Sequence, residues 1–276
     1  MHSRFSPRHF FVFGMTLCVV VAAAPRPLAE LPVEGSSRDV FSPDLRRNAT
    51  IPEMRWTVNV RGCSGSMLTP NHVLTANHCS PSVGAKYTSG GCYALGNCKD
   101  DLTVTKKTEC NSSLDYCIVE VKGSNAAALE TQRYAPAIVT NFATVKTGKD
   151  ADATALFTVG FPADLTGRPI YSPGFAKRKD PDSLMYNLGS INGNSGGAVF
   201  RQEDYALVTM TNFGTHAFGQ PGWNNNNAEN SGAWNGGGRM DKIYAQSATL
   251  KKLFPTGVNP LVDEEGALLF GPSQAN

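Results

Sequence analysis

The sequence has 276 residues, of which 17% are charged, and a formal net charge of +2. This length allows one large domain or two small ones with a full hydrophobic core. The balanced charge argues against a nucleic-acid-binding protein, which usually carries a basic excess or a basic stripe.

The N-terminus resembles a secretory signal. Arg4, Arg8 and His9 precede an apolar run over residues 10–21, which is followed by three alanines. A charged region, an apolar region and small residues in this order predict a signal peptide over residues 1–24. The run is shorter than the ~20 apolar residues of a spanning helix. We therefore expect a secreted, extracellular protein without a membrane segment once the signal is removed.

Residues 25–47 are rich in proline, serine and charge and lack periodicity, which predicts a pro-segment or linker and hence a zymogen. The pair Arg46-Arg47 is a candidate processing site. We expect the main domain over residues 48–254 and a tail over residues 255–276. Asn48 and Asn111 each begin a glycosylation sequon, which only a eukaryotic host would use.

From Trp56 onward, short β-branched and aromatic runs alternate with turn residues, which is typical of an all-β sandwich or barrel. The runs are WTVNVRG, GSMLTPNHVLTA, LTVTKKTEC, YCIVEV, ATALFTVGF, GGAVF and YALVTMTNFG. We interpret the basic cluster KRK at Lys177–Lys179 as a solvated loop. Near the C-terminus, GGRMDKIYAQSATLKKLF has apolar residues at helical spacing and predicts a helix.

Six cysteines remain after the signal is removed, all in the N-terminal half of the chain. They are Cys63, Cys79, Cys92, Cys98, Cys110 and Cys117. An even number in an exported chain predicts up to three disulfides. A zinc site is the competing interpretation, but no C-x-x-C pair and no histidine at ligand spacing support it. We expect neither a metal nor a cofactor.

One serine, Ser195, lies among glycines in GSINGNSGGAVF. A serine hydroxyl needs a nearby base before it can act as a nucleophile. His72, His78 and His216 are the histidines that remain after the signal. His78 follows an apolar run and precedes Cys79, which is able to bond Cys63 and fix the loop. Asp115 opens another apolar run as a carboxylate that could orient the histidine, and Asp100 and Asp101 are its rivals.

The blocks VLTANHC, LDYCIVEV and GNSGGAVF occur in this order, with spacings of 37 and 80 residues. Together they resemble the signature blocks of the chymotrypsin/trypsin-like serine proteases over about residues 56–254. The resemblance implies two six-stranded antiparallel β-barrels packed together with a C-terminal helix. It also implies a secreted serine endopeptidase that acts on proteins or peptides, and we expect it to be a monomer.

In this resemblance His78 is the general base, Asp115 the orienting carboxylate and Ser195 the nucleophile. The N–H groups of Gly193 and Ser195 form the oxyanion hole. The resemblance also implies a Cys63–Cys79 disulfide, and for the other four cysteines we favour two local pairs.

The same resemblance suggests the substrate pocket. Gly189, six residues before the serine, lies at its floor and offers no charge, which argues against a preference for Arg or Lys. The segment containing Asn212, Phe213 and Gly214 resembles the pocket wall. We interpret His216 as a surface-loop residue; the alternative interpretation is that it favours an acidic substrate side chain.

The chain departs from the animal digestive enzymes in two ways. After Arg47 it lacks an Ile-Val-Gly-Gly-type start, and Asn194 stands where those enzymes have the aspartate that pairs with the new N-terminus. A neutral amide cannot form that ion pair. The chain is thus more similar to bacterial-type secreted trypsin-like or glutamyl endopeptidases, and we expect activity without such a new N-terminus.

Three other functions compete. GNSGG fits the G-x-S-x-G elbow of α/β-hydrolases, but their acid and histidine follow the serine, and here only His216 does so. A zinc protease of the H-E-x-x-H type is unsupported. A catalytically silent homologue that acts as a secreted binding protein is the remaining alternative, because a fold does not fix a function.

Overall fold

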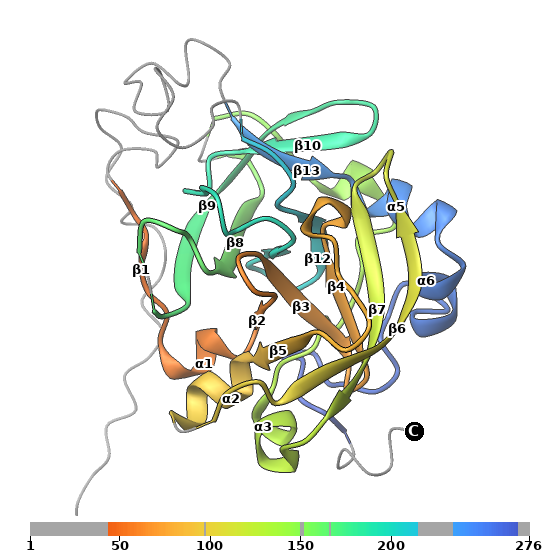
Figure 1. Ribbon diagram of the computed structural model, residues 1–276. Coiled ribbons are helices and arrows are strands. Elements are labelled where there is room, and N and C mark those ends of the chain that lie inside the picture. Colours follow the sequence, from red (N-terminus) through yellow and green to blue (C-terminus); the bar gives the residue numbers. More distant parts are fainter. Residues whose placement is uncertain (1–43, 97, 150–151, 166, 215–233, 270–276) are drawn as a thin grey trace, which may run out of the picture. The chain divides into compact units, whose positions relative to one another are not determined.

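The computed structural model describes residues 44–96, 98–149, 152–165, 167–214 and 234–269 (Figure 1). The expected signal peptide, most of the expected pro-segment and His216 lie outside the described residues. The strands are β1 (Arg47–Asn48), β2 (Val58–Asn59), β3 (Ser64–Thr69), β4 (His72–Thr75), β5 (Lys86–Ser89), β6 (Leu102–Asn111), β7 (Tyr116–Gly123), β8 (Ala155–Gly160), β9 (Ile170–Lys179), β10 (Ser183–Tyr186), β11 (Ala198–Arg201), β12 (Leu207–Met210) and β13 (Asn235–Gly238). The helices are α1 (Ile51–Met54), α2 (Gly90–Leu95), α3 (Ala126–Thr131), α5 (Met240–Gln246) and α6 (Ala248–Leu253), with 3-10 turns η2 (Asn77–Cys79) and η3 (Phe142–Thr144).

The first half of the domain is a closed antiparallel barrel with the strand order β2-β3-β4-β7-β6-β5. Its strands alternate apolar and polar side chains in part, and the apolar ones fill the barrel interior. Val58, Met67, Val73, Leu102 and Val119 are among these buried residues. Closure leaves no free sheet edge in this half.

The second half is a curled sheet with the order β12-β11-β8-β9-β10-β13, to which β1 adds by pairing with β9. Its two ends approach each other through an isolated antiparallel bridge between Thr209 and Arg239. The structure is mostly β, with a closed six-stranded barrel and a half-barrel sheet. The expected double-barrel fold is thus confirmed.

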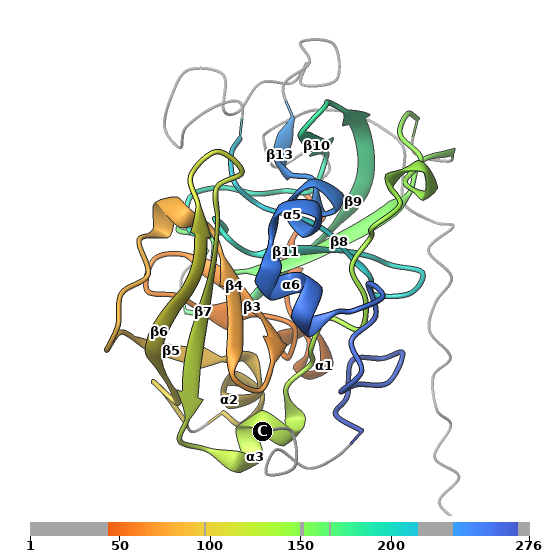
Figure 2. The ribbon, with the colours of Figure 1, turned by 90° about the vertical axis from the view of Figure 1, so that its right-hand side faces the viewer.

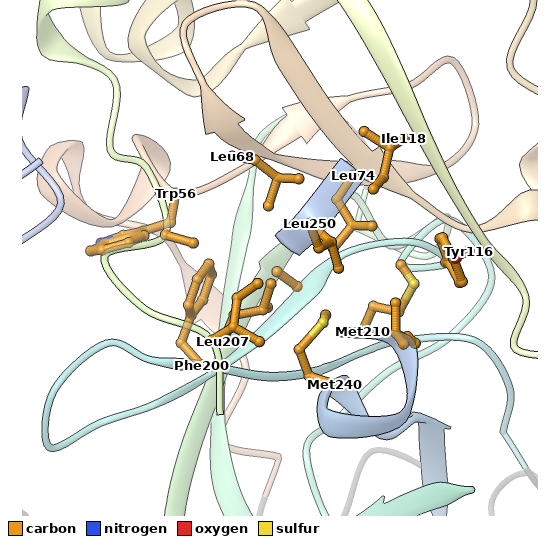
Figure 3. Close-up of a cluster of buried hydrophobic side chains, with 14 of the residues drawn as sticks. Trp56, Leu68, Leu74, Tyr116, Ile118, Phe200, Leu207, Met210, Met240 and Leu250 are labelled. Carbon is orange, nitrogen blue, oxygen red and sulfur yellow. The ribbon is translucent and has the colours of Figure 1, made fainter. Parts of the chain in front are cut away.

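A shared core joins the two halves to the C-terminal helices (Figure 3). Leu68 and Leu74 come from the first barrel, Phe200 and Met210 from the second sheet, and Leu250 from α6. Trp56 packs against Phe200 with ring centroids 4.9 Å apart. The residues of this core are nearly all buried, so removing large side chains here destabilises both halves together.

The predicted C-terminal helix is present and is divided at Ser247 into α5 and α6, which lie next to each other in Figure 2. The Ser247 hydroxyl accepts a hydrogen bond from the Leu250 N–H at 3.0 Å and so caps α6. Beyond α6 the chain returns to the first barrel, where the Asn259 side chain donates to the Leu68 carbonyl at 2.8 Å. No helix among the described residues is long and apolar enough to cross a membrane.

The six cysteines that follow the expected signal peptide form disulfides: Cys63–Cys79, Cys92–Cys98 and Cys110–Cys117. The expectation of three disulfides is confirmed. The third pair links facing residues of the β6–β7 hairpin. The KRK cluster, by contrast, is not a loop, because Lys177–Lys179 end strand β9 and pair there with β10.

Candidate active site

His78 lies in the short turn η2, directly after strand β4 of the first barrel. The Cys63–Cys79 disulfide fixes the next residue to the start of β3. Strand β4 pairs with β3 on one side and with β7 on the other and is buried from Val73 to Thr75, and the chain leaves the sheet at Ala76. The histidine ring therefore stands at the end of a rigid strand and is nearly half exposed.

Asp115 lies at the end of the β6–β7 hairpin turn, immediately before β7, with a left-handed φ of 50°. Aspartate tolerates this conformation better than most residues do. The Asn111 side chain accepts the Leu114 N–H at 2.9 Å and supports the turn. The Cys110–Cys117 disulfide closes the hairpin on either side of it.

The two residues meet through both carboxylate oxygens. Asp115 Oδ2 lies 2.6 Å from His78 Nδ1, and Asp115 Oδ1 accepts the His78 backbone N–H at 2.9 Å. An ionised carboxylate only accepts hydrogen bonds, so Nδ1 carries the proton in this pair. His78 Nε2 then keeps a lone pair and is able to act as a base.

A third residue holds the carboxylate from the second half of the domain. Asn212 Nδ2 donates to Asp115 Oδ2 at 2.9 Å and to the Asp115 carbonyl at 2.7 Å. Asn212 Oδ1 in turn accepts the Gly238 N–H at 3.0 Å. The sequence placed Asn212 in the pocket wall but did not indicate this contact, because no local motif relates it to Asp115.

Residues 189–197, which we call the glycine-rich loop, lie against the first barrel. Gly193 and Gly196 have φ values of 95° and 82°, where other residues are strained. A Cβ on Gly193 would lie 2.2 Å from the Phe161 carbonyl oxygen, and one on Gly196 would lie 2.3 Å from Thr75 Oγ1. Glycine is thus required at both positions by backbone shape and by close approach.

In the two peptide units that carry the Gly193 and Ser195 N–H groups, the carbonyl oxygen accepts a backbone hydrogen bond. The carbonyls of Asn192 and Asn194 accept the N–H groups of Ala163 at 2.8 Å and of Gly197 at 2.9 Å. In a trans peptide the N–H points away from the carbonyl of the same unit. Within the described part of the chain, no acceptor is bonded to the N–H of Gly193 or of Ser195.

Ser195 lies beside the histidine turn. Its carbonyl accepts the Ser64 N–H at 2.8 Å and lies 3.6 Å from Cys79 Sγ, the residue after His78. No hydrogen bond joins the Ser195 hydroxyl to the His78 ring in this structure. Such contacts are often long without a bound substrate and tighten when one binds.

The predicted rivals of Asp115 lie elsewhere. Asp101 is buried and accepts both the N–H and the hydroxyl of Ser89, at 2.7 and 2.6 Å. Asp100 lies beside it, and its N–H donates to Thr88 Oγ1 at 3.0 Å. Both residues thus stabilise the β5–β6 region of the first barrel, away from His78.

Gly189 packs against an unexpected charged residue. The aliphatic part of Arg46 approaches so closely that a Cβ on Gly189 would lie 2.8 Å from Arg46 Cγ. The Arg46 side chain is 4% exposed and its guanidinium pairs with Asp164 at 2.8 Å and Asp44 at 3.1 Å. Burial alone would lower the pKa of Arg46, but these hydrogen bonds raise it above its ordinary value. The described residues before Asn48 are therefore packed on the second sheet.

The other predicted wall residues lie on the strand segment after β12. Phe213 pairs with Gly236 through hydrogen bonds of 3.1 and 2.9 Å, and its side chain is exposed. Gly214 follows it and is the last described residue before the segment that contains His216.

A family model for the trypsin-like peptidase domain matches residues 63–210, more than half of the chain. The chain belongs to the trypsin-like peptidase family. This is the fold of a serine protease of the chymotrypsin family, and it implies protein substrates. No curated protein matches the sequence.

Two solved structures show the same fold at low identity. A Glu endopeptidase in complex with MPD is 21% identical, with a TM-score of 0.54, and the match covers 78% of this chain and 97% of that one. Mouse neuropsin, a serine protease expressed in the limbic system, is 14% identical, with a TM-score of 0.54 and coverage of 76% and 99%.

Proposed function

We propose that the protein is a secreted serine endopeptidase that cleaves peptide bonds through an acyl-enzyme. His78 is the general base and acid, Asp115 orients it, and Ser195 is the nucleophile. The N–H groups of Gly193 and Ser195 form the oxyanion hole. The observation that carries this proposal is the pairing of His78 with Asp115 beside a loop in which the N–H groups of Gly193 and Ser195 have no acceptor among the described residues.

The chemistry follows from the positions of these groups. Ser195 Oγ bonds to the scissile carbonyl carbon while its proton passes to His78 Nε2. The carbonyl oxygen becomes negative and accepts the two N–H groups, which stabilise it more strongly than the neutral carbonyl. His78 then gives its proton to the leaving amine, and the acyl ester remains on Ser195. Water repeats the sequence, releases the acid and restores the serine.

The environment of Asn194 supports activity without an Ile-type new N-terminus. Asn194 is 4% exposed, and its Oδ1 has no hydrogen-bond partner among the described residues. Its N–H donates to the Ile191 carbonyl at 3.0 Å, and its carbonyl accepts from Gly197. The turn is thus held by backbone hydrogen bonds, which do not depend on an ion pair at residue 194.

The three disulfides are consistent with the proposed secretion. Three disulfides persist in oxidising compartments and are uncommon in the cytosol. We propose that residues 1–24 direct secretion and that a segment before the barrels is removed later. Because Arg46 and Arg47 are both paired in the folded domain, cleavage between them would release packed residues.

The test is reaction of the secreted protein with a fluorophosphonate probe, together with hydrolysis of fluorescent casein. We compare wild type, Ser195→Ala and Ser82→Ala, the last being an exposed serine outside the site. We expect wild type and Ser82→Ala to react equally. We expect Ser195→Ala to lose labelling and about 10⁶-fold in hydrolysis.

A wild-type protein that neither labels nor hydrolyses casein would contradict the proposal. That result would favour the alternative, a catalytically silent homologue that acts as a secreted binding protein. Labelling that persists in Ser195→Ala would place the nucleophile elsewhere and would also contradict the proposed site.

A further inference from the structure

Ser64, the first residue of β3, has a fully buried side chain that contacts the glycine-rich loop. Its hydroxyl donates to the Gly193 carbonyl at 2.8 Å and accepts the Phe161 N–H at 2.9 Å. Its backbone N–H donates to the Ser195 carbonyl at 2.8 Å. One residue of the first barrel therefore binds both residues whose N–H groups form the proposed oxyanion hole.

The orientation of the Gly193 N–H depends on two peptide planes. The plane that contains this N–H also contains the Asn192 carbonyl, which the Ala163 N–H holds at 2.8 Å. The following plane contains the Gly193 carbonyl, which the Ser64 hydroxyl holds. Phe161 and Ala163 belong to one segment after β8, so this segment and Ser64 together fix the backbone on both sides of Gly193.

Gly193 needs this support because glycine has little conformational restriction of its own. Its φ of 95° is accessible to glycine along with many other conformations. Without a partner for its carbonyl, the peptide after Gly193 is held only through the Asn194 N–H, which donates to the Ile191 carbonyl at 3.0 Å. The donor geometry of the hole is then less well fixed. The neutral, buried Asn194 offers no charge that would anchor the same peptide.

We propose that Ser64 is a positioning residue that holds the oxyanion hole in its catalytic geometry. This inference rests on the function proposed above, since it assumes that Gly193 and Ser195 stabilise an oxyanion. Ser64 does not contact the substrate. It acts through the Gly193 carbonyl, so its loss should weaken binding of the transition state and leave binding of the substrate nearly unchanged.

The same strand supplies a matched control. Ser66 is also buried, and its hydroxyl also donates to a backbone carbonyl, that of Trp56 at 3.0 Å. Ser66→Ala removes a comparable hydrogen bond from β3 without touching the glycine-rich loop. A general weakening of the strand will thus affect Ser64→Ala and Ser66→Ala alike, whereas loss of positioning affects only the first.

The experiment uses the full secreted protein and three variants, Ser64→Ala, Ser64→Gly and Ser66→Ala. We measure kcat and KM for p-nitrophenyl acetate, the rate of phosphonylation by a fluorophosphonate, and the thermal midpoint. Deleting an oxyanion donor outright lowers the rate by ~10²–10³, so misplacing one should lower kcat by about 10- to 100-fold. We expect both Ser64 variants to show this fall in kcat, with a KM within about twofold of wild type. Their rate of phosphonylation should fall by a similar factor. Ser66→Ala should keep kinetics close to those of wild type.

Each other outcome overturns the inference. Equal kinetics of Ser64→Ala and Ser66→Ala would show that the hydroxyl does not position the hole. A rise in KM at constant kcat would assign Ser64 to substrate binding, and failure of both Ser64 variants to fold while Ser66→Ala folds would assign it to stability. A wild-type protein that reacts with neither reagent would overturn the proposed function, and this inference with it.

Discussion

The first barrel carries His78 and Asp115 on turns that are each flanked by a disulfide, whereas the second half carries Ser195 on a loop without cysteines. A disulfide braces each of these two turns, and Asn212 of the second half also holds the Asp115 carboxylate. Ser195 and its loop are held by hydrogen bonds from distant residues, above all from Ser64. The proposed base is therefore fixed locally, while the proposed nucleophile and oxyanion hole depend on how the two halves pack.

Among variants that keep Ser195, the largest expected effect lies in the first half. Asp115→Asn replaces an acceptor-only carboxylate by an amide, which no longer selects the Nδ1–H form of His78. We expect kcat to fall by about 10⁴-fold with little loss of stability, the size seen when other triads lose this carboxylate. Asp100→Asn is the control, because Asp100 shares the positive φ and lies outside the site.

In the second half, Asn194→Asp places a carboxylate in a buried position that lacks a cation among the described residues. An uncompensated buried charge typically costs about 3 kcal/mol or more of folding free energy. We expect denaturant unfolding at pH 7 to show this loss, whereas Asn141→Asp, an exposed change in the same half, should not. A stabilised and more active Asn194→Asp protein would mean that a cation does reach this residue.

Two disulfides of the first barrel differ in their position relative to Asp115. Removing Cys110–Cys117 or Cys92–Cys98 by double alanine substitution frees loops of similar length, with separations of 7 and 6 residues. The chain-entropy relation gives about 2.5 kcal/mol of stability for each. Only the first pair flanks Asp115, so we expect kcat to fall in that variant alone, measured at a temperature where both proteins remain folded.

The smallest effect concerns the contact between the first barrel and α6. Glu109 accepts the Tyr116 hydroxyl at 2.6 Å and the Thr249 N–H at 3.0 Å. Burial alone would raise the pKa of Glu109, but these hydrogen bonds to the carboxylate lower it below its ordinary value.

Because the folded-state pKa of Glu109 is lowered, its contribution to stability is present above the unfolded-state value of about 4.3 and is lost as the pH falls below it. Glu109→Gln should cost about 1 kcal/mol at pH 7 and should reduce the acid-induced part of the stability loss. Unfolding curves between pH 3 and 7 test this, with the exposed Glu130→Gln as control. An unchanged pH dependence would show that Glu109 is not held in the folded state as described.

Local sequence patterns predict much of the first barrel, because β-branched runs such as YCIVEV form its largely buried strands. The same patterns do not predict strands β9 and β13. Strand β9 contains Pro173 and the KRK cluster, and β13 is the sequence NGGG, so neither has the composition of a strand. Both form because neighbouring strands supply hydrogen bonds, which outweigh weak intrinsic preference.

The candidate site divides in the same way. The residues expected to act as base, orienting carboxylate and nucleophile lie within short motifs and are visible in the sequence. The contacts of Ser64, Asn212 and Arg46 are not, since their partners Gly193, Asp115 and Gly189 lie far away along the chain. No spacing rule relates such pairs, and only the packing of the two halves brings them together.

The most direct test of the proposed acyl-enzyme is a rapid-mixing measurement with p-nitrophenyl acetate. The account predicts a burst of p-nitrophenol close to one equivalent per chain, followed by slower turnover, because this activated ester acylates the serine faster than water removes the acetyl group. Acid quenching during the burst should give one acetyl group on the peptide that contains Ser195. Turnover without a burst, together with no adduct on Ser195, would contradict the account.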